Sequence, residues 1–273
     1  MSNSSTERTL IAVFNVFTIA AFTIAAWFAL FPAPALGGER SIVSIEARQW
    51  NASPSGRFSQ VGGTANETLD FESDLDLQED EALEGRLVFR PSRRTMIRLG
   101  FLPELQLAGD HVVSRSITFL GQDFTINQRV VTDFTIEYAR LGFAWQFISA
   151  AKGRFRLGPL IEARGFRGNL SLNAPDSPIP LSVTDEYEVA FGSAGLIAEL
   201  EISDRIELFG EVTEAVTGDE GDITETEYGI RVLVLPKLMV VAGVRTLEID
   251  FQDNGESFVF ELDGVFLGAQ VRF

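Results

Sequence analysis

The sequence predicts an all-β protein: an antiparallel transmembrane β-barrel of about ten strands, with eight as the alternative count, after an N-terminal signal peptide. Three observations support this prediction. The chain ends in a run of alternating residues that stops on an aromatic side chain, Phe273. It begins with a single long apolar segment, over 10–31, and has no second one. Between these ends, extended segments alternate with period two and are joined by short and long turns.

The N-terminal segment has the pattern of a cleaved signal peptide. One basic residue, Arg8, precedes the uncharged and mostly apolar run, and residues with small side chains follow it. Cleavage after Ala35 or after Gly37 fits these small residues, so we expect 1–37 to be the signal peptide and 38–273 to be the outer-membrane barrel. The alternative is an uncleaved anchor, because the run is long enough to cross a bilayer as one helix.

The C-terminal segment has the pattern of a strand that faces lipid on one side. Apolar odd-numbered residues alternate with small or polar ones: Val265, Leu267, Ala269, Val271 and Phe273 against Gly268, Gln270 and Arg272. Strands of transmembrane barrels alternate in this way because one face meets lipid and the other the lumen.

Composition excludes several classes of function. The formal net charge is −17, which disfavours nucleic-acid binding because that affinity depends on basic residues that neutralise phosphates. The chain has no cysteine, so disulfides, thiolate metal sites and thiol nucleophiles are excluded. The 22 basic residues include only two lysines, Lys152 and Lys237, and arginine is the residue that suits confined ion pairs.

Turn signals divide the chain into extended segments whose connections alternate in length. The expected strands are 41–50, 84–91, 95–106, 129–147, 154–172, 185–201, 205–216, 222–234, 237–251 and 256–273. The connections over 92–94, 149–153, 203–204 and around Pro236 are short, and 51–83, 107–128 and 173–184 are long. Short periplasmic turns that alternate with longer external loops are typical of outer-membrane barrels.

Two faces can be assigned along several of these segments. In 95–105 we expect Thr95, Ile97, Leu99, Phe101, Pro103 and Leu105 to face lipid, and Met96, Arg98, Gly100, Leu102 and Glu104 to face the lumen. Segments 139–147 and 154–164 alternate in the same way. Phe134, Ile136 and Tyr138 break the phase, as do Leu247, Ile249 and Phe251, so either bulges or strand ends above the membrane are required. A β-sandwich with the faces reversed is the alternative fold.

Charges on the expected inner face separate by sequence. The early segments supply Arg86, Arg90, Arg98, Arg140, Arg154, Arg156 and Arg164, and the later ones supply Glu199, Glu201, Glu207, Glu211, Glu225 and Glu227. Side chains largely fill a barrel of this size, and an unpaired buried charge costs several kcal/mol. We therefore expect the two sets to pair across a narrow lumen without an open channel.

One stretch, from Phe58 to Gly85, holds nine carboxylates and no basic side chain. Within it, Asp70, Glu72, Asp74 and Asp76 would share one face of an extended segment and offer oxygen ligands for Ca²⁺. The favoured interpretation is a solvated, mobile external loop, because like charges repel and the spacing differs from that of an EF-hand. Apart from this candidate metal site, we expect no cofactor.

The only histidine, His111, is the remaining candidate for chemistry. Asp110 and Ser114 are close in sequence, but alternation along a strand would place Asp110 and His111 on opposite faces. There is no Gly-x-Ser-x-Gly elbow and no His-x-x-x-His pair. We interpret His111 as a solvated loop residue and expect the protein not to be an enzyme.

Four stretches and the terminal Phe273 carry a resemblance to a known group. They are Leu69–Leu75, Phe89–Arg94, Ser116–Gly121 and Tyr138–Phe143. In these stretches, which span 69–147, the chain resembles a widespread, poorly characterised group of proteobacterial outer-membrane β-barrel proteins. Members often carry His after the paired basic residues, where this chain has Thr95. The resemblance implies the fold and a location in the bacterial outer membrane, and it implies no activity.

Three classes of function are compatible with these sequence features. The favoured one is a structural or surface-interaction barrel, and the others are a small-solute or ligand-carrying barrel and, least favoured, a membrane-embedded lipid-modifying enzyme. The expected partners are outer-membrane lipid and lipopolysaccharide, and the barrel-insertion machinery through the C-terminal strand. We expect a monomer that binds no nucleic acid.

Overall fold

The computed structural model describes residues 42–60, 67–119, 122–177, 181–216, 221–253 and 256–273. The expected signal peptide, 1–37, lies outside these residues. No helix in the described part of the chain is long and apolar enough to cross a bilayer.

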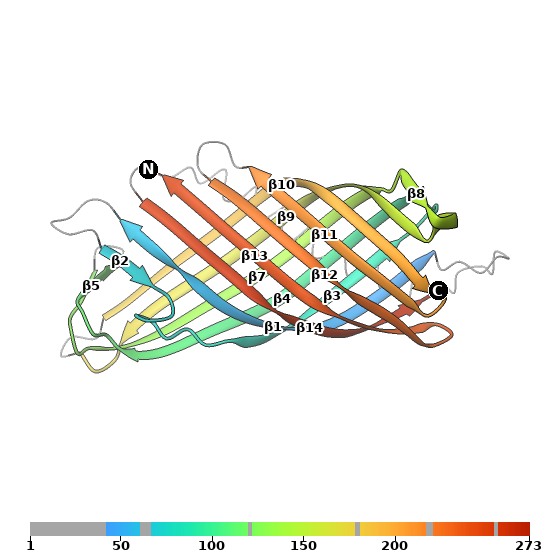
Figure 1. The fold of residues 1–273 in the computed structure, drawn as a ribbon. Coiled ribbons are helices and arrows are strands. Elements are labelled where there is room, and N and C mark those ends of the chain that lie inside the picture. Colours follow the sequence, from blue (N-terminus) through green and yellow to red (C-terminus); the bar gives the residue numbers. More distant parts are fainter. Residues whose placement is uncertain (1–41, 61–66, 120–121, 178–180, 217–220, 254–255) are drawn as a thin grey trace.

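Ten long strands form one closed antiparallel barrel (Figure 1), as the sequence predicts. In barrel order they are β1 (Val43–Gln60), β3 (Asp80–Phe89), β4 (Thr95–Val112), β7 (Arg129–Trp145), β9 (Phe155–Ala174), β10 (Leu181–Ser203), β11 (Ile206–Val216), β12 (Gly221–Leu235), β13 (Leu238–Asp253) and β14 (Glu256–Arg272). Four short strands lie at the ends: β2 (Glu67–Asp70), β5 (Ile117–Phe119), β6 (Gln122–Phe124) and β8 (Ile148–Ala150). A closed barrel leaves no long strand unpaired, and the β-sandwich alternative is therefore wrong.

The first and last strands close the barrel against each other. β1 and β14 pair without a break from Ser44 opposite Arg272 to Gln60 opposite Glu256. The amide of Phe273 donates to the carbonyl of Val43 at 2.8 Å, and its carbonyl accepts from the amide of Ile42 at 2.9 Å. The terminal residue thus contributes the last hydrogen bonds of this seam.

The short connections lie at one end of the barrel and the long ones at the other. The short-turn end consists of the turns over 90–94, 146–154, 204–205 and 236–237, as predicted, and both lysines lie there. The expected long loops 51–83 and 107–128 are wrong in part, because β1 continues to Gln60 and β4 to Val112. The strands are longer than predicted because the pattern of polarity changes at their far ends. There the outward side chains are polar and the inward ones are apolar, which is the opposite of the pattern used for the prediction.

Strand β7 shows this reversal most clearly. Its alternation never changes phase: odd-numbered side chains face outward throughout, and Phe134, Ile136 and Tyr138 are buried inside. Near the short-turn end the outward residues are apolar, as at Phe143, and from Glu137 to the beginning of the strand they are mostly polar, as at Glu137 itself. Of the two explanations considered, the strand end beyond an apolar belt is therefore the correct one here, and β13 follows it at Leu247 and Ile249.

A bulge occurs instead in β4. The register with β7 shifts between Leu102 and Leu105, so that Leu105 is buried and Glu104 is exposed. The predicted orientations of these two residues are therefore wrong. An extra residue in one strand exchanges the two faces beyond it.

The barrel consequently has two zones along its axis. In the zone next to the short turns, an outward apolar belt encloses a charged interior; the belt includes Ile97, Leu141, Phe143, Trp145, Leu196, Val265 and Leu267. In the zone next to the long loops, the interior is an apolar core built around residues such as Leu107, Phe134, Leu172 and Phe260. A transmembrane strand needs only about nine to eleven residues, so strands of 16 or 17 residues, such as β13 and β7, extend well beyond the belt.

Candidate functional site

A network of ion pairs fills the interior behind the apolar belt. At its centre Glu84 of β3 accepts bonds from Arg48 at 2.6 Å, Arg245 at 2.9 Å and Arg140 at 3.2 Å. Arg86 adds a contact at 2.9 Å from the same strand. β1 is the neighbour of β3, whereas β7 and β13 lie two and three strands away around the barrel, so the network reaches across the lumen.

A second carboxylate, Glu225 of β12, connects a further part of the wall. Arg140 and Arg164 approach it at 2.9 and 2.8 Å, and Arg245 at 3.0 Å. The Tyr138 hydroxyl also donates to it, at 3.0 Å. Each arginine therefore bridges two or more carboxylates, as the planar guanidinium allows.

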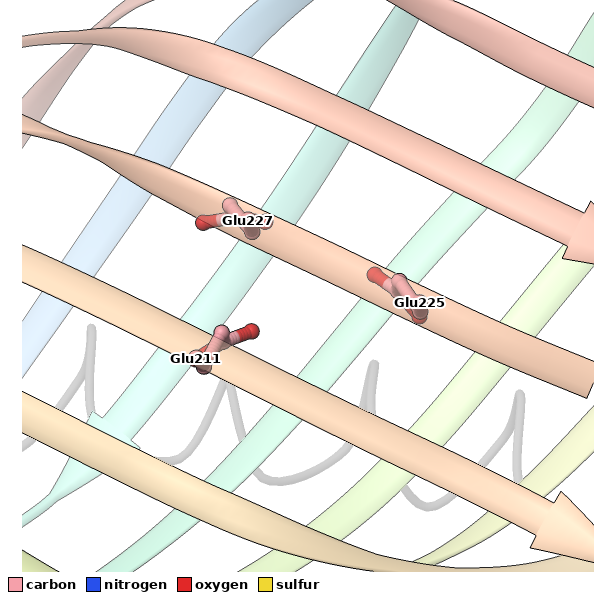
Figure 2. Close-up of side chains that lie close together, drawn as sticks. All are labelled: Glu211, Glu225 and Glu227. Atoms are coloured by element: carbon pink, nitrogen blue, oxygen red, sulfur yellow. The ribbon is translucent and has the colours of Figure 1, made fainter.

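Figure 2 shows three carboxylates that lie close together, Glu211 of β11 and Glu225 and Glu227 of β12. One oxygen of each lies within 4.8 Å of the others, which is a spacing that a metal ion can use. Arginines already pair with these carboxylates, because Arg98 pairs with Glu211 and Arg48 bonds Glu227 at 2.8 Å. We therefore interpret the three glutamates as the acidic part of the network.

A separate group of pairs lies nearer the short-turn end, around Glu199 of β10. Arg156 approaches Glu199 at 3.2 Å, and the Gln146 amide donates to it at 2.9 Å. Arg231 bonds Glu207 at 2.7 Å, and its guanidinium carbon lies 3.9 Å from the centre of the Phe209 ring. This stacking fixes the guanidinium plane while the charge is paired.

The predicted pairing of early arginines with late glutamates is confirmed by the geometry. Pairs of this kind are Arg86–Glu227, Arg90–Glu199, Arg98–Glu211, Arg140–Glu225, Arg156–Glu207 and Arg164–Glu225. Arg154 is an exception, because it is exposed in the turn and lies 3.6 Å from Asp204.

Sequence reasoning missed Arg48, Arg231, Arg245 and Glu84 as members of the network. It placed Glu162 on the inner face of its segment, where the structure buries it, but gave it no partner. Alternation alone would have placed Arg245 inside, because it has the parity of the buried Val241 on β13. Glu84 was assigned to the acidic stretch, although it is fully buried. No sequence signal separates it from its acidic neighbours except its position in a strand.

Residues 61–66 of the acidic stretch lie outside the described residues, and the described part is not one extended segment. Residues 71–75 form a turn, and Phe71, Leu75 and Leu77 are buried against the apolar core of the outer zone. Phe71 packs edge-on against Phe258 and Phe260, with ring centroids 5.9 and 5.8 Å apart. These apolar anchors hold the loop over the barrel mouth despite its charge.

The four candidate metal ligands are not on one face. Asp74 is buried and bonds Arg115, with a 3.1 Å contact to its Nε. Asp70 accepts from the amide and hydroxyl of Ser73 at 2.8 and 3.0 Å, while Glu72 and Asp76 are exposed. The one-face premise is thus wrong, and Ca²⁺ binding by Asp70, Glu72, Asp74 and Asp76 stays a prediction.

Arg115 holds Asp74 in its charged form. Burial by itself would raise the pKa of Asp74, but the hydrogen bond from Arg115 and the one from the Asp70 amide hold that pKa below its ordinary value. The contact ties the loop after β2 to the loop after β4. Gly109 makes this approach possible, because a Cβ there would lie 2.1 Å from the Leu75 carbonyl oxygen.

His111 lies on β4, opposite Val130 of β7, and is half-buried. Its assignment to a loop is therefore wrong. Its neighbour Asp110 points to the other face and pairs with Arg129, whose hydrogen bond lowers the pKa of that carboxyl. The geometry does not bring Asp110 and His111 together as a catalytic pair.

Comparisons with known proteins concern the fold. No family model matches the chain, and no curated protein matches it. The outer membrane protease OmpT from Escherichia coli has a TM-score of 0.61 at 9% identity, over 85% of this chain and 96% of that chain. The translocator domain of autotransporter NalP from Neisseria meningitidis has a TM-score of 0.49 at 12% identity, over 94% and 99%. The toluene transporter TodX from Pseudomonas putida has a TM-score of 0.36 at 10% identity, over 86% and 90%.

Likeness at such low identity concerns architecture and transfers no activity, and the two lower scores carry no argument. The OmpT match agrees with the closed antiparallel barrel described above. The chain therefore has the fold of an outer-membrane β-barrel.

Proposed function

We propose that this protein is a barrel of the Gram-negative outer membrane that is closed by its own interior and acts as a structural element and a surface for interactions. One observation carries the proposal: the ion-pair network reaches across the lumen. Arg48 and Glu227, for example, are 179 residues apart in sequence and bond at 2.8 Å.

The network supports a closed lumen on energetic grounds. Removing one partner of a buried ion pair costs about 3–5 kcal/mol, so the charges hold one another in place. The apolar core of the outer zone and the docked acidic loop add a second barrier above it. A solute path would have to disrupt both layers.

The outward surfaces support the proposed location and partners. The apolar belt would contact membrane lipid, and the acidic outer zone would face the cell exterior, where divalent ions and lipopolysaccharide are the partners that fit its charge. The seam between β14 and β1 makes the C-terminal strand the segment that the insertion machinery would engage. The proposal includes no catalytic activity and treats the barrel as a monomer.

Electrical recording tests the closed lumen. We expect the purified protein in planar bilayers to show no steady ohmic conductance. The double variant Glu84→Ala/Arg140→Ala removes the centre of the network and should conduct in bursts, provided that it still runs as a heat-modifiable band on gels. Steady conductance of the unmutated protein, of the size that general porins give, would contradict the proposal and favour a solute-carrying barrel.

A further inference from the structure

A cavity of about 710 Å³ opens at the short-turn end of the barrel, below the ion-pair network. The turn over 90–94, the turn over 149–153 and the beginning of β1 enclose it. Sites for small molecules typically have volumes of about 300–1,000 Å³. The cavity is therefore large enough for a ligand that carries several charged groups.

Its wall carries a large excess of positive charge. The lining includes seven basic residues, Arg90, Arg93, Arg94, Lys152, Arg156, Arg231 and Arg272, against two carboxylates, Glu201 and Glu207. This excess is local, because the chain as a whole has a net charge of −17.

Three of these cations have no carboxylate to neutralise them. In the part of the chain that the structure describes, no acidic oxygen lies within 4.0 Å of the charged nitrogens of Arg93, Arg94 or Lys152. All three line the cavity, and all three are exposed. Like charges in one concavity repel one another, and an anion that binds between them relieves this repulsion.

The inner wall adds polar atoms that also lack a partner. Gln146 is almost fully buried; its amide nitrogen donates to Glu199, but its Oε1 accepts no hydrogen bond among the described residues. The Nε atoms of Arg156 and Arg231 are likewise without an acceptor there. Buried polar groups normally have partners, so the inner wall is not fully satisfied by the described residues. The two Nε donors are compatible with an anion nearby, whereas the Gln146 oxygen is an acceptor and would bond only a donor group of the ligand.

We propose that this cavity is a binding site for a multiply charged anion that carries phosphate or carboxylate groups. Arg93, Arg94 and Lys152 would hold the charged groups of the anion, and Arg156 and Arg231 would form the inner wall behind it. Guanidinium groups suit this task because they bond both kinds of oxyanion bidentately. That the cavity opens to the periplasm rests on the proposed function, but anion binding itself does not require a closed lumen.

Calorimetric titration of the purified, detergent-solubilised barrel tests the site, with inorganic tripolyphosphate and citrate as probes at fixed ionic strength. The triple variant Arg93→Gln/Arg94→Gln/Lys152→Gln should bind about tenfold more weakly or worse, because it loses three charge-assisted bonds. The matched control Arg154→Gln/Arg205→Gln/Lys237→Gln removes the same charge from the same end outside the cavity. It should change the Kd less than about twofold, and both variants should remain heat-modifiable.

Two results would overturn the proposal: no binding of either probe at millimolar concentration, or equal weakening in both variants, which would mean a diffuse surface effect. A second arm identifies the source of the anion. Displacement of tripolyphosphate by short-chain phosphatidylglycerol, but not by short-chain phosphatidylcholine, would support a lipid headgroup as the ligand. Binding that neither lipid displaces would support a soluble anion. The conductance test of the closed lumen is independent of this binding test, so failure of one proposal does not imply failure of the other.

Discussion

At the residue scale, Glu84 and Glu81 show how the position in a strand decides the role of a carboxylate. Both lie on β3, three residues apart, and both belong to the same acidic stretch. Glu84 is fully buried among four arginines, whereas Glu81 faces outward beside the Gln49 amide. The two residues therefore form a matched pair for mutation.

We predict that Glu84→Gln lowers the free energy of unfolding by about 3–5 kcal/mol, because it leaves buried arginines without a counter-charge. Glu81→Gln should change it by less than about 0.5 kcal/mol, since the side chain is exposed. Urea unfolding in lipid vesicles measures both. Equal effects of the two substitutions would mean that the interior network does not hold the barrel together.

Asp74 supplies a second residue-scale prediction, on pH. Its folded pKa lies below its ordinary value, so its contact with Arg115 stabilises the loop fully above the unfolded pKa of about 3.9 and is lost as the pH falls through the lower folded pKa. We expect pepsin to cut within 61–79 faster as the pH falls below about 3.9, beyond the change in pepsin activity itself.

The variant Asp74→Asn should reproduce this loosening at neutral pH, where a general protease measures it. Glu72→Gln is the control, because Glu72 is exposed in the same turn. If both variants are cut at the wild-type rate, the apolar anchors alone hold the loop.

At the scale of the element, β7 tests where the belt ends. The chain has no cysteine, so single introduced cysteines can be labelled cleanly. In proteoliposomes, Thr135→Cys should react with a water-soluble maleimide, whereas Phe143→Cys should react only after the membrane is dissolved. Phe134→Cys, which points inward, should require denaturation. Equal reactivity of Thr135→Cys and Phe143→Cys would contradict the two-zone strand.

The C-terminal strand carries a prediction on assembly. Deleting Phe273 removes its three backbone hydrogen bonds to Ile42 and Val43 at the start of β1, and it removes the terminal aromatic. We expect slower assembly, measured as the fraction of heat-modifiable protein over time. Phe147→Ala removes another exposed aromatic from the same end and should assemble normally. Normal assembly of the deletion variant would count against the role of this strand in insertion.

At the scale of the whole molecule, two tryptophans report which face meets lipid. Trp145 is 51% exposed in the belt, and Trp50 is 1% exposed inside, with Arg245 stacked on its ring. The third, Trp27, lies in the segment that we expect to be removed. Brominated lipids should quench Trp145 in the Trp50→Phe variant and leave the Trp145→Phe variant nearly unquenched. Comparable quenching of the two variants would mean that the belt is not in contact with lipid.

The sequence by itself determined the local features. Period-two alternation indicated the ten-strand antiparallel barrel, the outward side of the last strand and the inward arginines such as Arg98 and Arg140. The short turns were equally visible, because Ser92, Pro236 and their neighbours are turn residues wherever they occur. These properties depend on neighbours in the chain.

Only the tertiary structure decided which distant groups meet. Closure of the sheet brings Glu84 against Arg245 and encloses the basic cavity between turns far apart in sequence. Closure also gives the outward face of β7 two different surroundings. Its apolar part lies in the belt and its polar part lies beyond the belt, although the alternation of side chains continues unchanged. A contact across the lumen leaves no local pattern, and the phase breaks in the sequence allowed either a bulge or a strand end beyond the membrane, so both questions required the folded barrel.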